Sequence, residues 1–321
     1  MRVTRIFIRK LLKTKDFILK IGVAISNYKN DEHVLHLINR ISKEEWDVEG
    51  IIVIDSLGDA KFIKDLDKKV SEKIIYKNYD YNLGSAGNLS KRLLLAREQK
   101  WDFVLALNHD ALVTKSTLEA LIKHTDIESL GALYPSKYYT DKGFYDFSGT
   151  REVGPWRSFG PSIKPDEDLI SHIWSSSNGA LYSLNPIREG IIPREELWMG
   201  WEDYLFGLDL RKAGYKQYLV CDATCDDNYE FQEKDFRIFK IKLAAKPQWY
   251  HYYRTRNLWL IACYYHRSFI RIIFVFIRTL AETVLIASGW ERTNKLNALK
   301  LQFKGFIDGL LNQKGKREIS Q

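Results

Sequence analysis

Apolar runs alternate with helical patterns through the first 135 residues of the chain. Five runs have the length of one buried strand: 21–26, 50–55, 73–78, 103–108 and 130–135. Three segments between them carry apolar residues at helical spacing: 32–45, 84–99 and 115–124. This alternation predicts βαβ units, and therefore an α/β fold with a mostly parallel, Rossmann-like sheet flanked by helices.

The pattern changes twice after Pro135. As far as Trp174 the chain is rich in Gly, Pro, Ser and aromatic residues, which is typical of long loops around a cleft. A short strand at 180–183 and an amphipathic helix at 202–213 follow, and Gly214 closes the helix. From about residue 246, aromatic and basic residues mix and then give way to an apolar helical pattern. We therefore expect three parts: a basic N-terminal segment (1–20), an α/β domain (21–245) and a C-terminal helical appendage (246–321).

Neither end of the chain has the pattern of a signal peptide or a membrane span. Basic residues interrupt the apolar positions of 1–20, which excludes a signal peptide. Segment 268–288 is long enough to cross a bilayer, but it contains Arg271, Arg278 and Glu282. Such charges argue against a span, and they leave two alternatives: a helix that lies on a membrane, or one that packs in a core.

Composition narrows the class of protein. Of the 321 residues, 45% are hydrophobic and 13% aromatic, which excludes a disordered chain. Three cysteines without a C-x-x-C pair indicate neither a disulfide framework nor zinc, and fit a reducing cytoplasm. The net charge of +8 favours anionic partners. Nucleic acid is disfavoured, because the basic residues concentrate among apolar helical positions and form no recognition module.

Polar residues follow the predicted strands, at the edge where open α/β sheets bind ligands. Ser26 and Asn27 end the first run, Asp55 ends the second, and Asn108, His109 and Asp110 follow the fourth. A carboxylate at the position of Asp110 suits a hard divalent cation that neutralises a diphosphate. An acid that caps the next turn accounts for Asp110 equally well.

Two further segments carry candidate chemistry. The glycines of N-L-G-S-A-G-N (82–88) bring backbone amides and a helix N-terminus toward a diphosphate, although a glycine-rich turn explains them as well. In W-M-G-W-E-D (198–203), helix capping explains Glu202. The two tryptophans instead indicate a carboxylate set in an apolar wall. That carboxylate would take a proton from a sugar hydroxyl while the tryptophan rings stack on sugar faces.

The order of these motifs resembles one enzyme family. S-N-Y, I-D-S, N-L-G-S-A-G-N, N-H-D, S-N-G-A-L-Y-S (177–183), the W-E-D helix and Y-Y-R-T-R-N (252–257) occur in sequence, with a fainter echo at 305–310. The chain from Ile21 to Asn257 is similar to the family-two inverting glycosyltransferases of GT-A fold. It is most similar to the rhamnosyltransferase and galactofuranosyltransferase-like members that build bacterial surface polysaccharides.

The resemblance implies roles for individual residues. Asp203 corresponds to the catalytic base, and Asp110 to the last acid of the D-x-D metal motif. Donor-binding residues are expected at Ser26, Asn27, Asp55, Asn82, Gly84, Asn88, His109 and Asp110. Acceptor or sugar contacts are expected at Asn178, Gly179, Trp198, Trp201 and Glu202. Two departures affect the Mg²⁺ or Mn²⁺ site: Asn108 replaces the first acid, and Asp226 or Asp227 stands where a histidine ligand is expected.

The implied reaction transfers a sugar from a nucleoside-diphosphate donor, dTDP-rhamnose or a UDP-sugar, to a glycan or lipid-linked acceptor. Such an enzyme is expected at the inner face of the membrane, with its C-terminal helices on anionic lipid or forming a homo-oligomer. Two alternatives stand. A sugar nucleotidyltransferase is disfavoured, because 26–30 lacks a glycine-rich basic signature. A non-catalytic scaffold is allowed by Asn108.

Overall fold

A computed structural model provides the structure. It describes the following residues: 19–58, 63, 66, 68–139, 144–146, 167–226, 231–235, 240–244, 247–290 and 294–318. The strand order of the main sheet is β3-β2-β1-β4-β8-β5-β9-β7, with β6 paired to β5. A separate hairpin joins β10 (Phe231–Asp235) to β11 (Lys240–Ala244).

The first half of the sheet is parallel, as the alternating pattern predicts. It consists of β1 (Ile21–Asn27), β2 (Ile51–Ser56), β3 (Ile74–Tyr79) and β4 (Phe103–Asn108). Each observed strand lies within one residue of its predicted bounds. The register pairs Asn27 with Asp55 and Ser26 with Asn108, so the polar residues that end these strands share one edge.

The second half of the sheet is mixed. Strand β8 (Ala180–Ser183) runs antiparallel between β4 and β5 (Leu130–Tyr139). Strand β9 (Lys216–Asp226) runs parallel to β5, and β7 (Leu169–Ser171) closes the edge. Strand β6 (Phe144–Asp146) extends β5 as a hairpin. Strand β9 was not predicted, because its alternating sequence K-Q-Y-L-V-C-D-A-T-C-D lacks a continuous apolar run.

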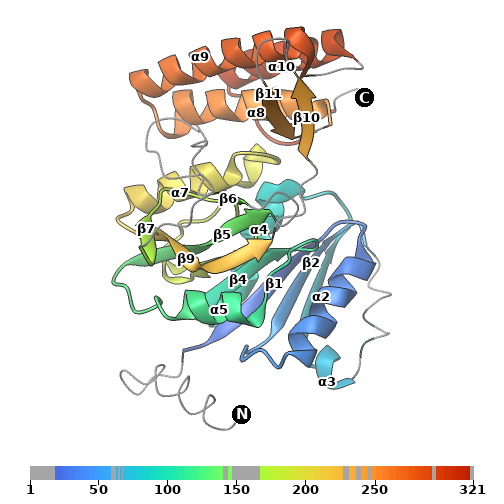
Figure 1. The fold of residues 1–321 in the computed structure, drawn as a ribbon, viewed down its shortest axis with the longest axis vertical. Coiled ribbons are helices and arrows are strands. Elements are labelled where there is room, and N and C mark those ends of the chain that lie inside the picture. The colour runs from blue at the N-terminus through green and yellow to red at the C-terminus, as the bar shows by residue number, and fades with distance from the viewer. Residues whose placement is uncertain are drawn as a thin grey trace.

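Helices cover both faces of the sheet (Figure 1). On one face, α2 (Asp31–Lys43) and α5 (Lys115–Ile122) bury their apolar residues with Val23 and Ile25 of β1. On the other, α4 (Gly84–Glu98) and α7 (Glu202–Lys212) pack with Ala24 and with Ile52 and Ile54. Alternate strand residues thus enter opposite cores, which is why these strands are apolar throughout. The short helices α3 (Lys68–Ser71), α6 (Asn185–Arg188) and η3 (Glu195–Leu197) lie in connections.

The C-terminal region forms the predicted helical appendage, at one end of the molecule (Figure 1). It contains α8 (Trp249–Leu260), η4 (Ile261–Tyr265), α9 (Phe269–Leu285), η5 (Ile286–Trp290) and α10 (Lys295–Leu310). Glycine permits close packing of α10 on α8, because a Cβ on Gly305 would lie 2.4 Å from the Tyr252 carbonyl oxygen and one on Gly309 would lie 2.8 Å from that of Arg256. Among the described residues, no helix is both long and apolar enough to cross a membrane.

Candidate active site

The ends of β1 and β2 hold a network of buried polar side chains. The Asn27 amide donates to Asp55 Oδ2 at 3.1 Å and to Asp31 Oδ1 at 2.6 Å. The Tyr76 hydroxyl donates to the same Asp55 oxygen at 2.7 Å. Asp55 Oδ1 is also enclosed, and it has no hydrogen-bond partner among the described residues. One carboxylate oxygen is therefore fixed by the protein, and the other is an acceptor for a further N–H or O–H group.

Exposed apolar side chains follow the same strands. Tyr28 follows β1, Leu57 follows β2 and Tyr81 lies two residues beyond β3, and each is more than two-fifths exposed. Flat or apolar side chains beside a polar edge are suited to contact a nucleobase. The S-N-Y motif includes Tyr28 without a role for it, and nothing in the sequence separated Leu57 and Tyr81 from core residues.

The end of β4 connects to a turn before β8. Ser26 Oγ donates to Asn108 Oδ1 at 3.3 Å, and the Asn108 amide N–H donates to Asn178 Oδ1 at 3.0 Å. Gly179, with φ of 84°, donates from its amide N–H to the Ala106 carbonyl at 2.8 Å. The predicted residues Ser26, Asn178 and Gly179 are thus brought to the β4 edge, where Asn178 and Gly179 have a structural role.

His109 and Asp110 continue from this edge, and Asp110 is exposed. Burial lowers the pKa of His109, and the neighbouring Asp110 carboxylate opposes that shift. The His109 ring lies edge-on to that of His33 at 6.4 Å between centroids. Neutral imidazole is therefore favoured here, in a position to donate or accept one hydrogen bond.

The glycine-rich turn before α4 makes its hydrogen bonds within the protein. Gly84, with φ of 67°, donates from its amide N–H to Asn82 Oδ1 at 2.9 Å, and the Ala86 amide donates to the Trp198 carbonyl at 3.1 Å. These two amides at the start of α4 therefore bind protein oxygens. Of the two alternatives, the glycine-rich turn describes them, and amides directed at a diphosphate do not. A Cβ on Gly84 would lie 2.1 Å from the Trp198 oxygen, so glycine is needed for the close approach of the two loops. Asn88 donates to the Ile54 carbonyl at 3.3 Å, and its Oδ1 has no partner among the described residues.

The loop from Trp198 to Trp201 precedes α7 in an unusual conformation. Trp198, Gly200 and Trp201 have φ of 59°, 82° and 67°, and left-handed backbone is costly for the two tryptophans. Helix α8 holds this loop in place. The buried Asn257 amide donates to the carbonyls of Leu197, Met199 and Gly200 at 3.0, 2.9 and 2.8 Å. This explains the Y-Y-R-T-R-N motif, to which the sequence analysis assigned no role.

Both tryptophans contact the C-terminal helices. The Trp198 ring lies 4.5 Å from that of Tyr253, and its Nε1 donates to the Asn82 carbonyl at 3.2 Å. Trp201 Nε1 donates to the Arg254 carbonyl at 3.0 Å, and the Arg278 guanidinium lies 4.9 Å above its ring. The two rings thus connect the loop to the appendage, and their predicted role in sugar stacking stays a prediction.

Two adjacent acids begin α7. Burial raises the pKa of Asp203 to about 8, and the Glu202 carboxylate adds to that shift, whereas Ser177 and Arg92 oppose it. Burial also raises the pKa of Glu202. Asp203 Oδ1 and Glu202 Oε2 are enclosed without a hydrogen-bond partner among the described residues. An acid with an oxygen that makes no hydrogen bond and a pKa near neutrality is suited to proton transfer.

Two contributing residues were missed by sequence reasoning. Arg92 of α4 is fully buried and donates to the Leu107 carbonyl at 2.8 Å, beneath the end of β4. Ser177 bonds Asp203, and the next residue, Asn178, bonds the end of β4, so two consecutive residues link the acid to the strand edge. The signal for Arg92 was that it is the one charged residue on the buried face of α4. Ser177 begins the S-N-G-A-L-Y-S motif, but nothing in the sequence connects it to Asp203.

The metal prediction has limited support in the side chains. No group of three or more His, Cys, Asp or Glu residues suited to a metal occurs in the described part of the chain. Asp226 is the last residue of β9, and Asp227 lies outside the described residues. Asp110 is an exposed carboxylate at the β4 edge, so it fits a cation that takes its other ligands from a diphosphate and water.

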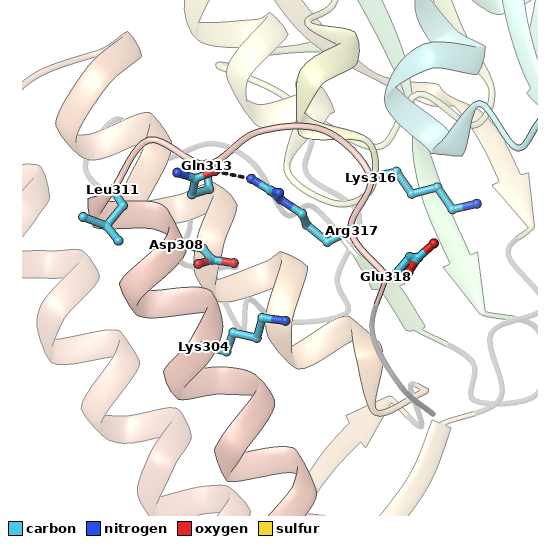
Figure 2. A pocket seen from close by; sticks show the side chains of 7 residues that line it. All are labelled: Lys304, Asp308, Leu311, Gln313, Lys316, Arg317 and Glu318. Carbon is cyan, nitrogen blue, oxygen red and sulfur yellow. Dashed lines mark hydrogen bonds between the residues drawn. The ribbon is translucent and has the colours of Figure 1, made fainter.

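A cavity of about 560 Å³ lies between α10 and the chain that follows it (Figure 2). It is lined by Lys304, Asp308, Leu311, Gln313, Lys316, Arg317 and Glu318. Asp308 accepts a hydrogen bond from Tyr252 at 2.6 Å, and the Lys316 ammonium lies 5.8 Å from the Trp198 ring. The cavity therefore adjoins the loop that leads to Asp203.

Solved structures with the same fold include three proteins of known ligands. TarS of S. aureus, in complex with UDP-GlcNAc, matches with a TM-score of 0.56 at 15% identity over 91% of this chain and 82% of TarS. The mannosyltransferase PcManGT of Pyrobaculum calidifontis, in complex with GDP-Man and Mn²⁺, matches at 0.52 and 12% identity over 97% and 94%. GalNAc-T7, with UDP, GalNAc and Mn²⁺, matches at 0.56 and 10% identity over 92% of this chain and 57% of its own.

These likenesses establish the fold. The chain has the α/β architecture of GT-A glycosyltransferases, with C-terminal helices added. No protein-family model matches the sequence, and no curated protein matches it. The activity must therefore be argued from the site.

Proposed function

We propose that this protein is an inverting glycosyltransferase that uses a nucleoside-diphosphate sugar. The observation that carries the proposal is Asp203, an acid whose pKa is raised to about 8. One of its oxygens has no hydrogen-bond partner among the described residues, and Ser177 and Asn178 link it to the ligand edge of a GT-A sheet. The fold neighbours bind UDP, UDP-GlcNAc or GDP-Man, which supports a donor of this class.

The donor is assigned to the ends of the parallel strands. Asp55 Oδ1 is placed to accept an N–H of the base, because Asn27 and Tyr76 already fix its other oxygen. Tyr28, Leu57 and Tyr81 offer apolar surface to the base and ribose. Asn82, Gly84 and Asn88 shape the wall of this pocket, and His109 and Asp110 face the diphosphate.

The reaction is a single displacement at the anomeric carbon. Asp203 removes the proton of an acceptor hydroxyl, the hydroxyl oxygen forms the new bond, and the nucleoside diphosphate leaves with the bonding electron pair. A base of this kind contributes about 10²–10⁴-fold in rate. The Glu202 carboxylate raises the pKa of Asp203 and so makes Asp203 a stronger base, and the positive charge of Arg92 reduces the repulsion between the two carboxylates.

A divalent cation, Mg²⁺ or Mn²⁺, is proposed at Asp110. Such a cation supplies charge neutralisation for the diphosphate. Two fold neighbours are structures with Mn²⁺, which supports this assignment. Asn108 replaces the first acid of D-x-D, and its Oδ1 accepts from Ser26, so the protein contributes few ligands and the affinity for metal is expected to depend on bound donor.

The acceptor is proposed to be a glycan or lipid-linked saccharide, held near Trp198, Trp201 and Glu202. The motif resemblance supports dTDP-rhamnose or a UDP-sugar as donor, surface-polysaccharide synthesis as the setting, and the inner face of the membrane as the place. A non-catalytic scaffold is the second candidate, and Asn108 is the observation that favours it.

Purified protein incubated with a panel of nucleotide sugars tests the function. We expect one donor to raise the melting temperature and to release its nucleoside diphosphate. Release should depend on a divalent cation and weaken in EDTA. Stabilisation by a donor without any release, across a range of acceptors, would instead support the scaffold. No stabilisation by any nucleotide sugar would contradict both.

A further inference from the structure

Helix α9 carries charge inside and apolar residues outside. All of its exposed residues are apolar: Phe269, Ile270, Ile273, Phe276, Ile277, Leu280, Ala281 and Val284. Two of its three buried residues are charged, Arg278 and Glu282. This is the reverse of a helix whose outer face meets water, where polar residues face the solvent.

The inward charges of α9 are already paired within the protein. Glu282 Oε1 lies 2.8 Å from Arg278 Nε and 2.9 Å from Arg254 Nη2. Arg278 also lies over the Trp201 ring. Arg254 and Arg278 therefore hold the appendage against Trp201 of the loop before α7, and no exposed residue of α9 is charged.

Exposed apolar side chains concentrate on this region. Thirteen of the sixteen large hydrophobic side chains exposed in the described part of the chain lie between Tyr264 and Leu311. The exposed apolar residues of α10 form one stripe along the helix: Leu296, Phe303, Ile307 and Leu310. We call the exposed apolar residues of α9 and α10 the outer face. An apolar surface of this extent marks an interaction site.

Cations border the outer face. Arg267 precedes α9, and exposed Lys295, Lys300 and Lys304 alternate with the apolar stripe of α10. No exposed acid occurs among the described residues between Arg267 and Leu311. Opposite a second copy of this chain the lysines would meet like charges, whereas anionic headgroups would meet them with opposite charge.

We propose that the outer face rests in the headgroup region of an anionic lipid bilayer, with α9 and α10 lying parallel to the membrane plane. Apolar side chains then enter the acyl boundary, and the lysines bind headgroup phosphate. Helix α9 has 17 residues and is roughly 25 Å long, so it offers an extended contact without crossing the membrane.

If the outer face lies on a bilayer, a lipid-anchored acceptor is favoured over a free glycan; this step rests on the proposed function. The cavity in Figure 2 has Leu311, an exposed apolar residue directly after α10, on one side and Lys316, beside Trp198, on another. It therefore extends from the end of α10 toward the loop before Asp203. An acceptor anchored in lipid through an anionic group fits this path, because Lys304, Lys316 and Arg317 line the cavity.

Vesicle flotation with the full chain tests the proposal. The variant Ile273→Gln, Ile277→Gln, Leu280→Gln makes the outer face polar without loss of helix propensity. The matched control, Ile273→Leu, Ile277→Leu, Leu280→Ile, keeps the same positions apolar. With vesicles of phosphatidylcholine and phosphatidylglycerol, we expect wild type and control to float, and the Gln variant to lose about tenfold or more of its binding.

A second pair of variants tests the charges. Lys295→Gln, Lys300→Gln, Lys304→Gln should lower binding to anionic vesicles several-fold and remove most of its salt dependence. The same change at Lys43, Lys73 and Lys123, exposed lysines of the α/β domain, should have no effect.

Three results would overturn the proposal. Wild type that stays below the vesicles contradicts it, and so does a Gln variant that floats like wild type. Dimers of wild type in sedimentation, lost in the Gln variant and accompanied by no flotation, would make the outer face a self-association surface. Nucleoside diphosphate release without vesicles is read separately, so failure of the proposed reaction remains distinguishable from failure of lipid binding.

Discussion

Asp55, which is fully buried, and Asp203, which is half-buried, are acids at two parts of the proposed site, and their surroundings differ. Asp55 accepts hydrogen bonds from Asn27 and Tyr76 within the sheet edge. Asp203 lies beside a second acid, after a loop with left-handed tryptophans, and its pKa is raised to about 8. The first arrangement favours a fixed carboxylate that binds, and the second favours a carboxylate that exchanges a proton.

The difference also separates the elements that hold the two acids. Asp55 is fixed by neighbouring strands whose register the sheet determines. The loop before Asp203 is fixed by α8, through Asn257 and through Arg256, which donates to the Leu197 carbonyl at 2.7 Å. The appendage therefore holds the loop before Asp203, and the predictions below test the Asp55 part and the Asp203 part of the proposed site separately.

The largest expected effect belongs to Asp203→Asn. The change keeps side-chain size and removes the proton acceptor, so turnover should fall on the order of 10²–10⁴-fold while donor affinity changes little. Glu202→Gln is the matched control and should retain most of the turnover. Sugar transfer and calorimetric donor binding measure the two effects, and wild-type turnover in Asp203→Asn would refute the base assignment.

Asn257→Ala should have the next largest effect. Three carbonyls of the loop before α7 lose their amide donor, so the orientation of Asp203 becomes less defined. We expect kcat to fall about tenfold, with unchanged donor affinity and a lower melting temperature. Asn297→Ala, which removes an amide bond to Gln248 within the appendage, should leave kcat unchanged. Equal kcat values for the two variants would remove Asn257 from the positioning role.

Asp55→Ala should act on the other half of the site. Loss of the base contact should weaken donor binding about tenfold and leave kcat at saturating donor nearly unchanged. Tyr76→Phe, which removes one of the two donors to Asp55, should give a smaller loss. Isothermal titration with a nucleoside diphosphate measures both. A fall in kcat without a change in affinity would place Asp55 in the chemical step instead.

The last effect is on folding stability and not on turnover. Because the pKa of Asp203 is raised in the folded state, folding retains a proton that the unfolded chain loses as the pH rises from about 4 to about 8. Wild type should therefore lose stability over that interval relative to Asp203→Asn, whose side chain does not titrate. Melting temperatures at pH 5 and pH 9 measure this. If the difference in melting temperature between wild type and Asp203→Asn is the same at both pH values, the pKa of Asp203 is not raised by burial.

Sequence patterns predicted the strand ends around Asp55 better than they predicted the surroundings of Asp203. Continuous apolar runs predicted β1 to β4 within a residue, and residues at strand ends meet at one edge by topology alone. Antiparallel β8 and the alternating strand β9 depend on contacts with distant strands, and a local pattern does not encode them.

The loop before Asp203 depends on long-range contacts that sequence spacing does not reveal. Gly84 and Trp198 are 114 positions apart, yet the Trp198 carbonyl lies against Gly84 and accepts a hydrogen bond from the nearby Ala86 amide. Likewise, the charged residues within 268–288 were correct evidence against a membrane span, but only the structure places Arg278 and Glu282 inward and the apolar residues outward.

The pH dependence of kcat tests the central claim most directly, namely that Asp203 takes the acceptor proton at a site where burial and Glu202 raise its pKa. We expect log kcat at saturating substrates to rise with unit slope below pH 8 and to level off above it, since the deprotonated acid is the active form. In Glu202→Gln, the loss of a neighbouring negative charge should move the same curve to lower pH. A kcat that is constant from pH 6 to pH 9 in both proteins would contradict the account.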